Sequence, residues 1–274
     1  MKKLLFALAT LVALNASAQG LKTPAASPGQ TISQDFGLSK VTINYSRPAM
    51  KGRKIFGDLV PFGAQWRTGA NGPTTITFGE DVNVGGKDVK AGTYSILSVP
   101  GKSTWEIKLA KEGTSVFDYK DEAVVTTFTV PSTTLPFEIE NFTIMTSDIT
   151  ANSMNIQLLW SNVMVQFPVK VDVDAKIMGE IENVMNKDSK PYFQAASYYF
   201  ENGKDLNKAL EWATKAADAQ PDAYWVKHLL AKVQAKAGKK TEAIATAKAS
   251  MALAEKGGNQ DYVKLNQQLI SSLK

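Results

Sequence analysis

The sequence predicts a two-domain protein of the β + α class, in which an antiparallel β-sandwich or open barrel is followed by a short α-helical module. Apolar residues alternate with polar ones from about residue 41 to residue 167, as half-buried strands require. Beyond residue 171 the composition shifts to Ala, Lys, Glu and Gln with helical spacing. The expected domains therefore cover residues 30–170 and 172–274.

The strand prediction rests on period-two runs such as Val41, Ile43 and Tyr45. Similar runs occupy residues 76–78, 94–98, 105–109, 123–130, 137–145, 154–160 and 163–169. Gly85 and Gly86 lie where a tight hairpin needs positive φ. The connections are too short to contain helices, so we expect seven to nine short antiparallel strands and not a parallel α/β sheet.

The helical half contains an internal sequence repeat. Ala209 and Ala213 recur as Ala243 and Ala247, 34 residues later, and Pro221 closes the first unit. This period and these small residues resemble tetratricopeptide repeats (TPRs), in which small side chains let paired helices approach closely. We expect helices at 174–187 and 260–273 to cap the two units.

The N-terminus predicts export. Residues 1–18 begin with two lysines, continue with an apolar run to Leu14 and end in Ala16-Ser17-Ala18, as in a signal peptide. We expect a mature chain from Gln19, located in the periplasm or secreted, with no membrane insertion after cleavage. The chain has no cysteine, so disulfide bonds cannot stabilise it and the hydrophobic core must do so.

The arginines are unevenly distributed. All three, Arg47, Arg53 and Arg67, lie in residues 47–67, here called the arginine loop, whereas lysines are spread along the chain. Arginine is favoured over lysine where a planar fork of donors must meet carboxylates, phosphates or carbonyls. The positive charge is concentrated in this loop, unlike the broad basic face of a nucleic-acid-binding protein, so we expect no nucleic-acid partner.

Five motifs in and around this loop occur in a fixed order. They are Tyr45-Ser46-Arg47-Pro48, Gly52-Arg53-x-Ile55-Phe56-Gly57, Val60-Pro61-Phe62-Gly63, Trp66-Arg67-x-Gly69-Ala70-Asn71 and Ala91-Gly92-x-Tyr94. Together they resemble the bacterial family called domain of unknown function 2911 (DUF2911), over about residues 30–170. The chain departs from the family pattern at Gly72-Pro73-Thr74. The resemblance implies an exported β-rich domain, frequently with a helical-repeat tail, and no established activity.

The candidate ligand-binding residues are the three arginines with Phe56, Trp66 and Asn71. Three roles remain open for the arginine loop. The guanidinium groups can donate to the loop's own backbone carbonyls. They can instead line a groove for an anionic or glycan ligand, with Phe56 and Trp66 as stacking faces. In the third, Asp58 or Asp35 acts as a general base beside the arginines.

The sequence argues against the common catalytic centres. One histidine, His228, and no cysteine are too few for a catalytic metal site, so we expect no metal and no cofactor. The glycine spacing matches no phosphate-binding loop, and no nucleophile elbow is present. Asp172 and Asp174 precede a helix, where capping and the helix dipole explain them.

We therefore expect an exported, non-enzymatic binding or structural protein of the cell envelope, with a helical tail for protein contact. The alternative is a hydrolase of envelope polysaccharide or peptide, which needs a pair of carboxylates in a cleft. The candidates for such a pair are Glu80, Asp81, Asp118 and Asp121.

Overall fold

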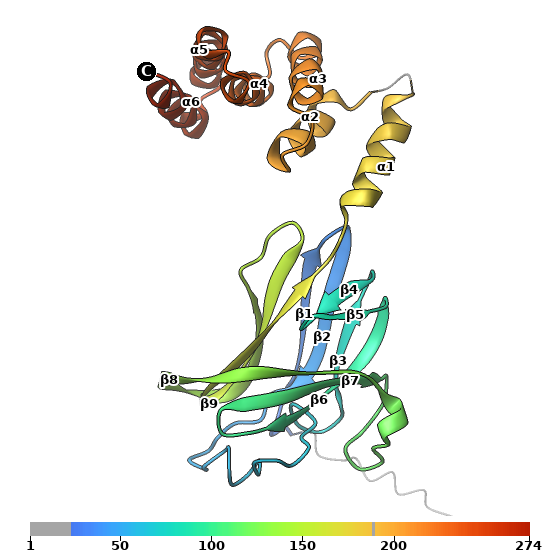
Figure 1. Cartoon of the computed structure of the whole chain (residues 1–274). Helices are drawn as coiled ribbons and strands as arrows, with labels where there is room; N and C mark the ends of the chain where they lie inside the picture. Colours follow the sequence, from blue (N-terminus) through green and yellow to red (C-terminus); the bar gives the residue numbers. More distant parts are fainter. Residues whose placement is uncertain (1–22, 188–189) are drawn as a thin grey trace, which may run out of the picture. The chain divides into compact units, whose positions relative to one another are not determined.

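The computed structural model describes residues 23–187 and 190–274 (Figure 1). These residues divide into two compact units, with the boundary between Asp172 and Val173. The first unit contains the strands and the second the α-helices, which confirms the predicted β + α class. The predicted signal peptide, residues 1–18, lies outside the described residues. Among the described helices, none has the length and apolar character needed to cross a bilayer.

In the described residues of the first unit, the strands form one antiparallel sheet of nine strands in the order β1-β2-β3-β6-β7-β8-β9-β4-β5. The strands are β1 (Gly29–Phe36), β2 (Ser39–Ser46), β3 (Thr74–Phe78), β4 (Val82–Val84), β5 (Lys87–Val89), β6 (Gly92–Pro100), β7 (Thr104–Lys111), β8 (Val124–Ser147) and β9 (Ser153–Lys170). The β4–β5 hairpin turns at Gly85 and Gly86, with φ of 57° and 86°, as predicted from the glycine pair.

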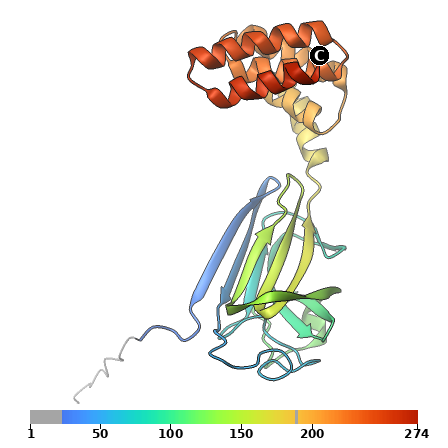
Figure 2. The same cartoon turned by 90° about the vertical axis from the view of Figure 1, so that its left-hand side faces the viewer.

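The sheet folds over on itself because β8 belongs to two layers. Its first part pairs with β7 up to Pro131, and from Ser132 onward it pairs with β9. Figure 2 shows the β1–β2 hairpin beside the β8–β9 hairpin. The Tyr45 ring of β2 meets the Phe142 ring of β8 edge to face, with centroids 5.7 Å apart. The predicted sandwich or open barrel is thus an open sheet folded into two facing layers.

The strand boundaries predicted for the last part of this unit were wrong. Four short runs were expected at 123–130, 137–145, 154–160 and 163–169, but the structure has two long strands, β8 and β9. In β8 the alternation of apolar and polar residues is interrupted where the strand passes from one layer to the other. The interruption comes from proline residues and from a change in which side chains are buried. Such breaks mark a bend in one strand as readily as the end of it.

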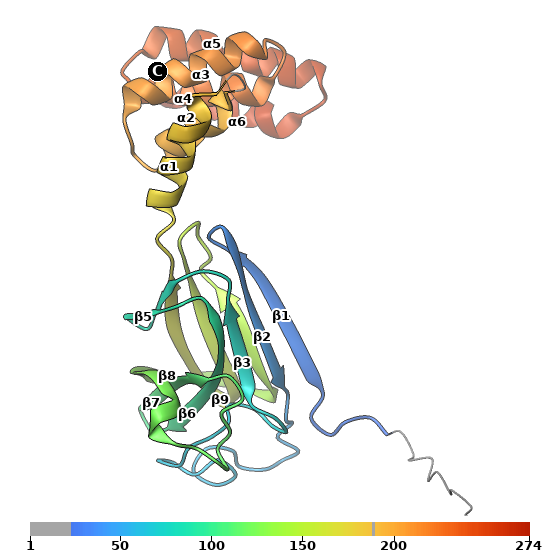
Figure 3. The same cartoon turned by 90° about the vertical axis from the view of Figure 1, so that its right-hand side faces the viewer.

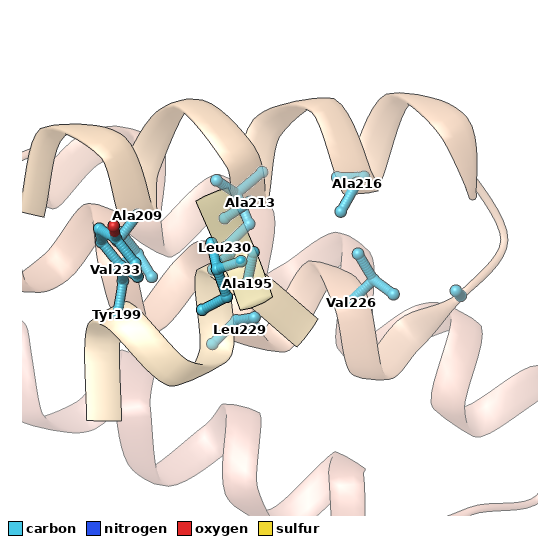
Figure 4. Close-up of a cluster of buried hydrophobic side chains, with 13 residues drawn as sticks. Ala195, Tyr199, Ala209, Ala213, Ala216, Val226, Leu229, Leu230 and Val233 are labelled. Atoms are coloured by element: carbon cyan, nitrogen blue, oxygen red, sulfur yellow. The ribbon is translucent and has the colours of Figure 1, made fainter. Parts of the chain in front are cut away.

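The second unit consists of helices α1 to α6. They are α1 (Asp174–Met185), α2 (Tyr192–Glu201), α3 (Leu206–Ala219), α4 (Tyr224–Lys236), α5 (Lys240–Lys256) and α6 (Gln260–Ser272). Figure 4 shows the core in which Ala209 and Ala213 of α3 lie against Tyr199 of α2 and the apolar side chains of α4. Ala243 and Ala247 of α5, which repeat Ala209 and Ala213, are also fully buried. Small side chains therefore line the helix contacts, while the likeness to TPRs stays a prediction.

A buried polar network joins α4, α5 and α6. The Asn266 amide nitrogen donates to Ser250 Oγ at 2.9 Å, and Ser250 Oγ donates to the Tyr224 carbonyl at 2.7 Å. Asn266 Oδ1 lies 2.9 Å from His228 Nδ1, so the neutral His228 ring carries its proton on Nδ1. Burial lowers the pKa of His228, and Lys232 lowers it further against the raising effect of the Asn266 hydrogen bond. His228 thus has a packing role.

Candidate functional site

The arginine loop leaves β2 and lies at one end of the first unit, where its start is joined to the outer edge of β8 (Figure 3). The Tyr45 hydroxyl accepts from the Ile144 amide at 2.9 Å. Arg47 donates from Nε to the Phe142 carbonyl at 3.0 Å and from Nη2 to Thr143 Oγ1 at 2.7 Å. Tyr45 and Arg47 of the first motif therefore form hydrogen bonds with polar groups along the edge of β8 that does not pair with β9. Without them this edge would face solvent.

The loop backbone continues this pairing. The Phe142 amide donates to the Pro48 carbonyl at 2.9 Å, and the Met50 amide donates to the Glu140 carbonyl at 2.8 Å. Residues 140–142 are irregularly paired with β9, because Ile139 pairs with Ser161 and Thr143 with Leu159. The loop therefore supplies hydrogen-bond partners where the β8–β9 ladder is interrupted.

Arg53 and Arg67 donate to backbone carbonyls three or four residues away in the sequence. Arg53 donates from Nε to Met50 O at 2.9 Å and from Nη2 to Ala49 O at 2.6 Å. Arg67 donates from Nη1 to Asn71 O at 2.7 Å, and its guanidinium lies 4.6 Å from the Phe117 ring centroid. The hydrogen bonds of Arg53 and Arg67 thus fit the structural role, in which guanidinium groups satisfy nearby irregular backbone, whereas Arg47 donates to β8 and not to the loop's own carbonyls.

Asn71 has a local structural role as well. Its φ is 59°, and its amide nitrogen donates to Ser27 O at 3.1 Å and Ser46 Oγ at 3.2 Å. The following Gly72 and Pro73 line a hollow of about 310 Å³ against β1 and β2. Of the segment that departs from the family pattern, Gly72 is exposed and Pro73 partly exposed, whereas Thr74 is fully buried.

Backbone strain is concentrated near the loop. Among the five non-glycine residues with positive φ in the described chain, Lys51, Thr68 and Asn71 lie in or beside the loop, and Ser161 of β9 faces it across the cavity described below. Thr68, a β-branched residue at φ 55°, is fully buried, with its hydroxyl 2.9 Å from Ser98 Oγ. Such conformations persist only where the surroundings fix them, and here buried contacts and hydrogen bonds hold the backbone at Thr68 and Asn71.

Trp66 and Phe56 belong to an aromatic cluster beneath the loop. Trp66 stacks on Trp160 with ring centroids 5.7 Å apart, and Phe56 meets Trp105 at 4.9 Å. The Trp66 indole nitrogen donates to Gly69 O at 3.0 Å. Both side chains are buried, so Trp66 anchors the loop to the core, while Phe56 also borders the cavity described next.

A cavity of about 480 Å³ lies between the arginine loop and residues 135–138 of β8, here called the β8 bulge. The bulge arises because Thr134 pairs with Val163 and Ile139 with Ser161, so four residues of β8 face one of β9. The polar and aromatic lining comprises Arg53, Lys54, Phe56 and Phe62 from the loop, Glu138 from the bulge, and Ser161 and Asn162 from β9. Of the predicted site residues, this cavity brings together Arg53 and Phe56.

Sequence reasoning missed Glu138, Ser161 and Asn162, which come from about 100 residues further along the chain. Nothing in their local sequence marks them, since the register of β8 and β9 places them. Phe62 was present in the third motif, and the available signal was an aromatic residue between a proline and a glycine in the arginine loop.

The carboxylates considered for catalysis lie in several places. Glu80 accepts from the Leu38 amide at 2.9 Å, and Asp81 accepts from the Ala91 amide at 2.9 Å and from Lys90 Nζ. Asp118 and Asp121 are exposed on the β7–β8 connection. Asp58, in the arginine loop, and Asp35, on β1, are likewise exposed. In the part of the chain that the structure describes, no group of three or more His, Cys, Asp or Glu side chains could hold a metal ion.

Asp174 lies in the first turn of α1, where the helix dipole favours a carboxylate, and Val173 occupies the N-cap position. Its carboxylate accepts from Tyr198 Oη at 2.8 Å and from Lys204 Nζ. The Lys204 hydrogen bond, followed by that of Tyr198, lowers the pKa of Asp174. Asp174 thus joins α1 to the α2–α3 pair.

These features define a class of protein: a folded-over antiparallel sheet with a hydrogen-bonded arginine loop and an adjoining cavity, followed by a helical unit. Residues 27–169 match the model of a protein family of unknown function, DUF2911. The chain belongs to this family, as the motifs around the loop predicted. The searches found no similar protein among curated sequences and no similar solved structure.

Proposed function

We propose that this protein is an exported, non-enzymatic binding protein of the cell envelope, whose first unit takes a small anionic or glycan ligand. The observation that carries the proposal is the cavity of about 480 Å³ beside the arginine loop. Its volume lies within the range of about 300–1,000 Å³ that is typical of small-molecule sites. It combines charged, amide and hydroxyl side chains with two phenyl rings, as such sites do.

Preorganisation supports a binding role. Two carbonyls fix the Arg53 guanidinium at the cavity, and Ser161 lines the opposite wall with a strained backbone. A site whose side chains are already ordered loses less conformational entropy when it binds a ligand. The same contacts also serve the fold, so a test must separate affinity from stability.

Calorimetric titration with acidic and neutral oligosaccharides, on the wild type and two matched variants, tests the proposal. Arg53→Lys should weaken ligand binding, because the ammonium cannot keep two carbonyl bonds and a fixed donor position together. Arg67→Lys is the control, since Arg67 supports the backbone beside Asn71 and does not line the cavity. Equal affinities in all three proteins, or no binding of any ligand, would contradict a binding role for the cavity.

Two other roles compete with this proposal. A purely structural role is favoured by the carbonyl bonds of the arginines, and it predicts that both lysine variants change only stability. A hydrolase needs paired carboxylates, and the polar lining of the cavity includes one, Glu138. Turnover of an envelope polysaccharide or peptide that disappears in Glu138→Gln would favour the hydrolase.

For the helical unit we propose contact with a protein partner. The partly exposed Trp225 of α4 and Leu265 of α6 support this, because large apolar side chains on a surface are enriched at interfaces. A photocrosslinking residue at position 225 should capture one defined partner that the same residue at the exposed position Lys248 does not. Export is tested by fractionation together with N-terminal sequencing, for which Gln19 is the expected first residue.

A further inference from the structure

The cavity beside the arginine loop has mixed charge. Arg53 and Lys54 supply two cations from the loop, and Glu138 supplies a carboxylate from the β8 bulge. Among the described residues, Glu138 forms no ion pair with either cation. A ligand that complements this lining carries an acidic group on one side and hydrogen-bond donors on the other.

Phe62 provides an apolar surface at the cavity. Its side chain is 42% exposed and lines the cavity. The ring lies against Gly57, where an added Cβ atom would lie 2.6 Å from ring atom Cε2. Because Gly57 has φ of 85°, both the backbone conformation and the close approach require glycine there. The exposed part of the ring suits the apolar C–H face of a sugar.

The β9 wall supplies groups that match hydroxyls. Asn162 offers an amide donor and acceptor, and Ser161 offers a hydroxyl beside it. Glu138 accepts hydrogen bonds from ligand hydroxyls or amides. A simple inorganic anion would use only the two cations, and a neutral sugar would leave both without a charge partner.

We infer that the ligand of this cavity is a sugar that carries a carboxylate. Its carboxylate faces Arg53 and Lys54, its ring lies on Phe62, and its hydroxyls meet Glu138 and Asn162. This inference rests on the proposed binding function and specifies the ligand class.

The test uses an oligosaccharide containing glucuronic acid and the same oligosaccharide with its carboxylate reduced to an alcohol. Titration calorimetry on the full chain should give an affinity at least about tenfold higher for the acid, because a charge-assisted hydrogen bond is lost on reduction. Lys54→Gln should remove most of this preference. Lys51→Gln is the control, because Lys51 is a neighbouring exposed lysine that does not line the cavity. Phe62→Ala should weaken both ligands alike, and circular dichroism verifies that each variant is folded.

The outcomes separate the two claims. Equal affinity for the acid and its reduced form would overturn the acidic-sugar inference and leave a glycan-binding function standing. Inorganic phosphate or acetate binding as tightly as the acidic sugar, with no effect of Phe62→Ala, would overturn the sugar part. The absence of binding by either oligosaccharide and by both anions would overturn the proposed function as well.

Discussion

The Tyr45 hydroxyl connects the two layers of the sheet, so its removal should be costly. Tyr45 is 4% exposed, and its oxygen accepts from the Ile144 amide at 2.9 Å while donating to Gln30 Oε1 at 2.8 Å. In Tyr45→Phe the phenyl ring still packs against Phe142, but the Ile144 amide loses its partner in the interior. An unsatisfied buried donor costs about 1–3 kcal/mol, and we expect a loss in that range from the free energy of unfolding.

The assay is urea unfolding followed by near-ultraviolet circular dichroism, to which the aromatic cluster of the first unit contributes. Gln30→Ala is the matched control, because it removes the other partner of the same hydroxyl at an exposed position, where water replaces it. We expect the control to lose less than about 0.5 kcal/mol. Hydrogen exchange of the Ile144 amide should accelerate in Tyr45→Phe only. A loss below about 0.5 kcal/mol in Tyr45→Phe, with unchanged exchange at Ile144, would show that the Tyr45 hydroxyl does not stabilise the Ile144 amide.

Three further predictions concern packing and charge. Gly57→Ala should destabilise the first unit by more than Gly52→Ala. Both positions have positive φ, but only Gly57→Ala places a methyl group against Phe62. Equal losses of stability in urea unfolding would count against close packing of the Phe62 ring on Gly57. Ala213→Leu should cost the helical unit about 1–3 kcal/mol, because the site is fully buried, and unchanged thermal unfolding would show that the helices can move apart. Burial places the folded-state pKa of His228 below its unfolded value near 6.5, so the unfolded chain binds the proton first as the pH falls. Stability of the helical unit should therefore decrease below about pH 6.5, and His228→Gln should abolish that dependence in pH-resolved denaturation; an identical pH profile in the variant would contradict this role.

Local sequence predicted the two structural classes and much of their detail. Alternation of apolar and polar residues located β2, β3, β6 and β7, although β6 is buried on both faces over Tyr94–Ser98, and the glycine pair located the β4–β5 turn. Alanine spacing located the buried faces of α3 and α5. In each case a short segment contains its own periodic signal.

The paths of β8 and β9 could not be predicted in the same way. Their bend depends on which layer covers each part of the strand, and that information lies in distant residues such as Tyr45 and Arg47. The candidate cavity likewise depends on residues that are distant in the sequence. Arg53 and Phe56 were identifiable because arginine and aromatic residues cluster in the loop, whereas Glu138 and Asn162 reach the cavity only through the register between β8 and β9.

The attachment of the arginine loop to β8 has a consequence for self-association. An uncovered strand edge is a template on which strands of other molecules can assemble into aggregates. Between Glu140 and Ile144 that template is already occupied by Met50, Pro48, Arg47 and Tyr45 of the same chain. Variants that detach the loop should therefore become prone to fibril formation at concentrations where the intact protein stays dispersed.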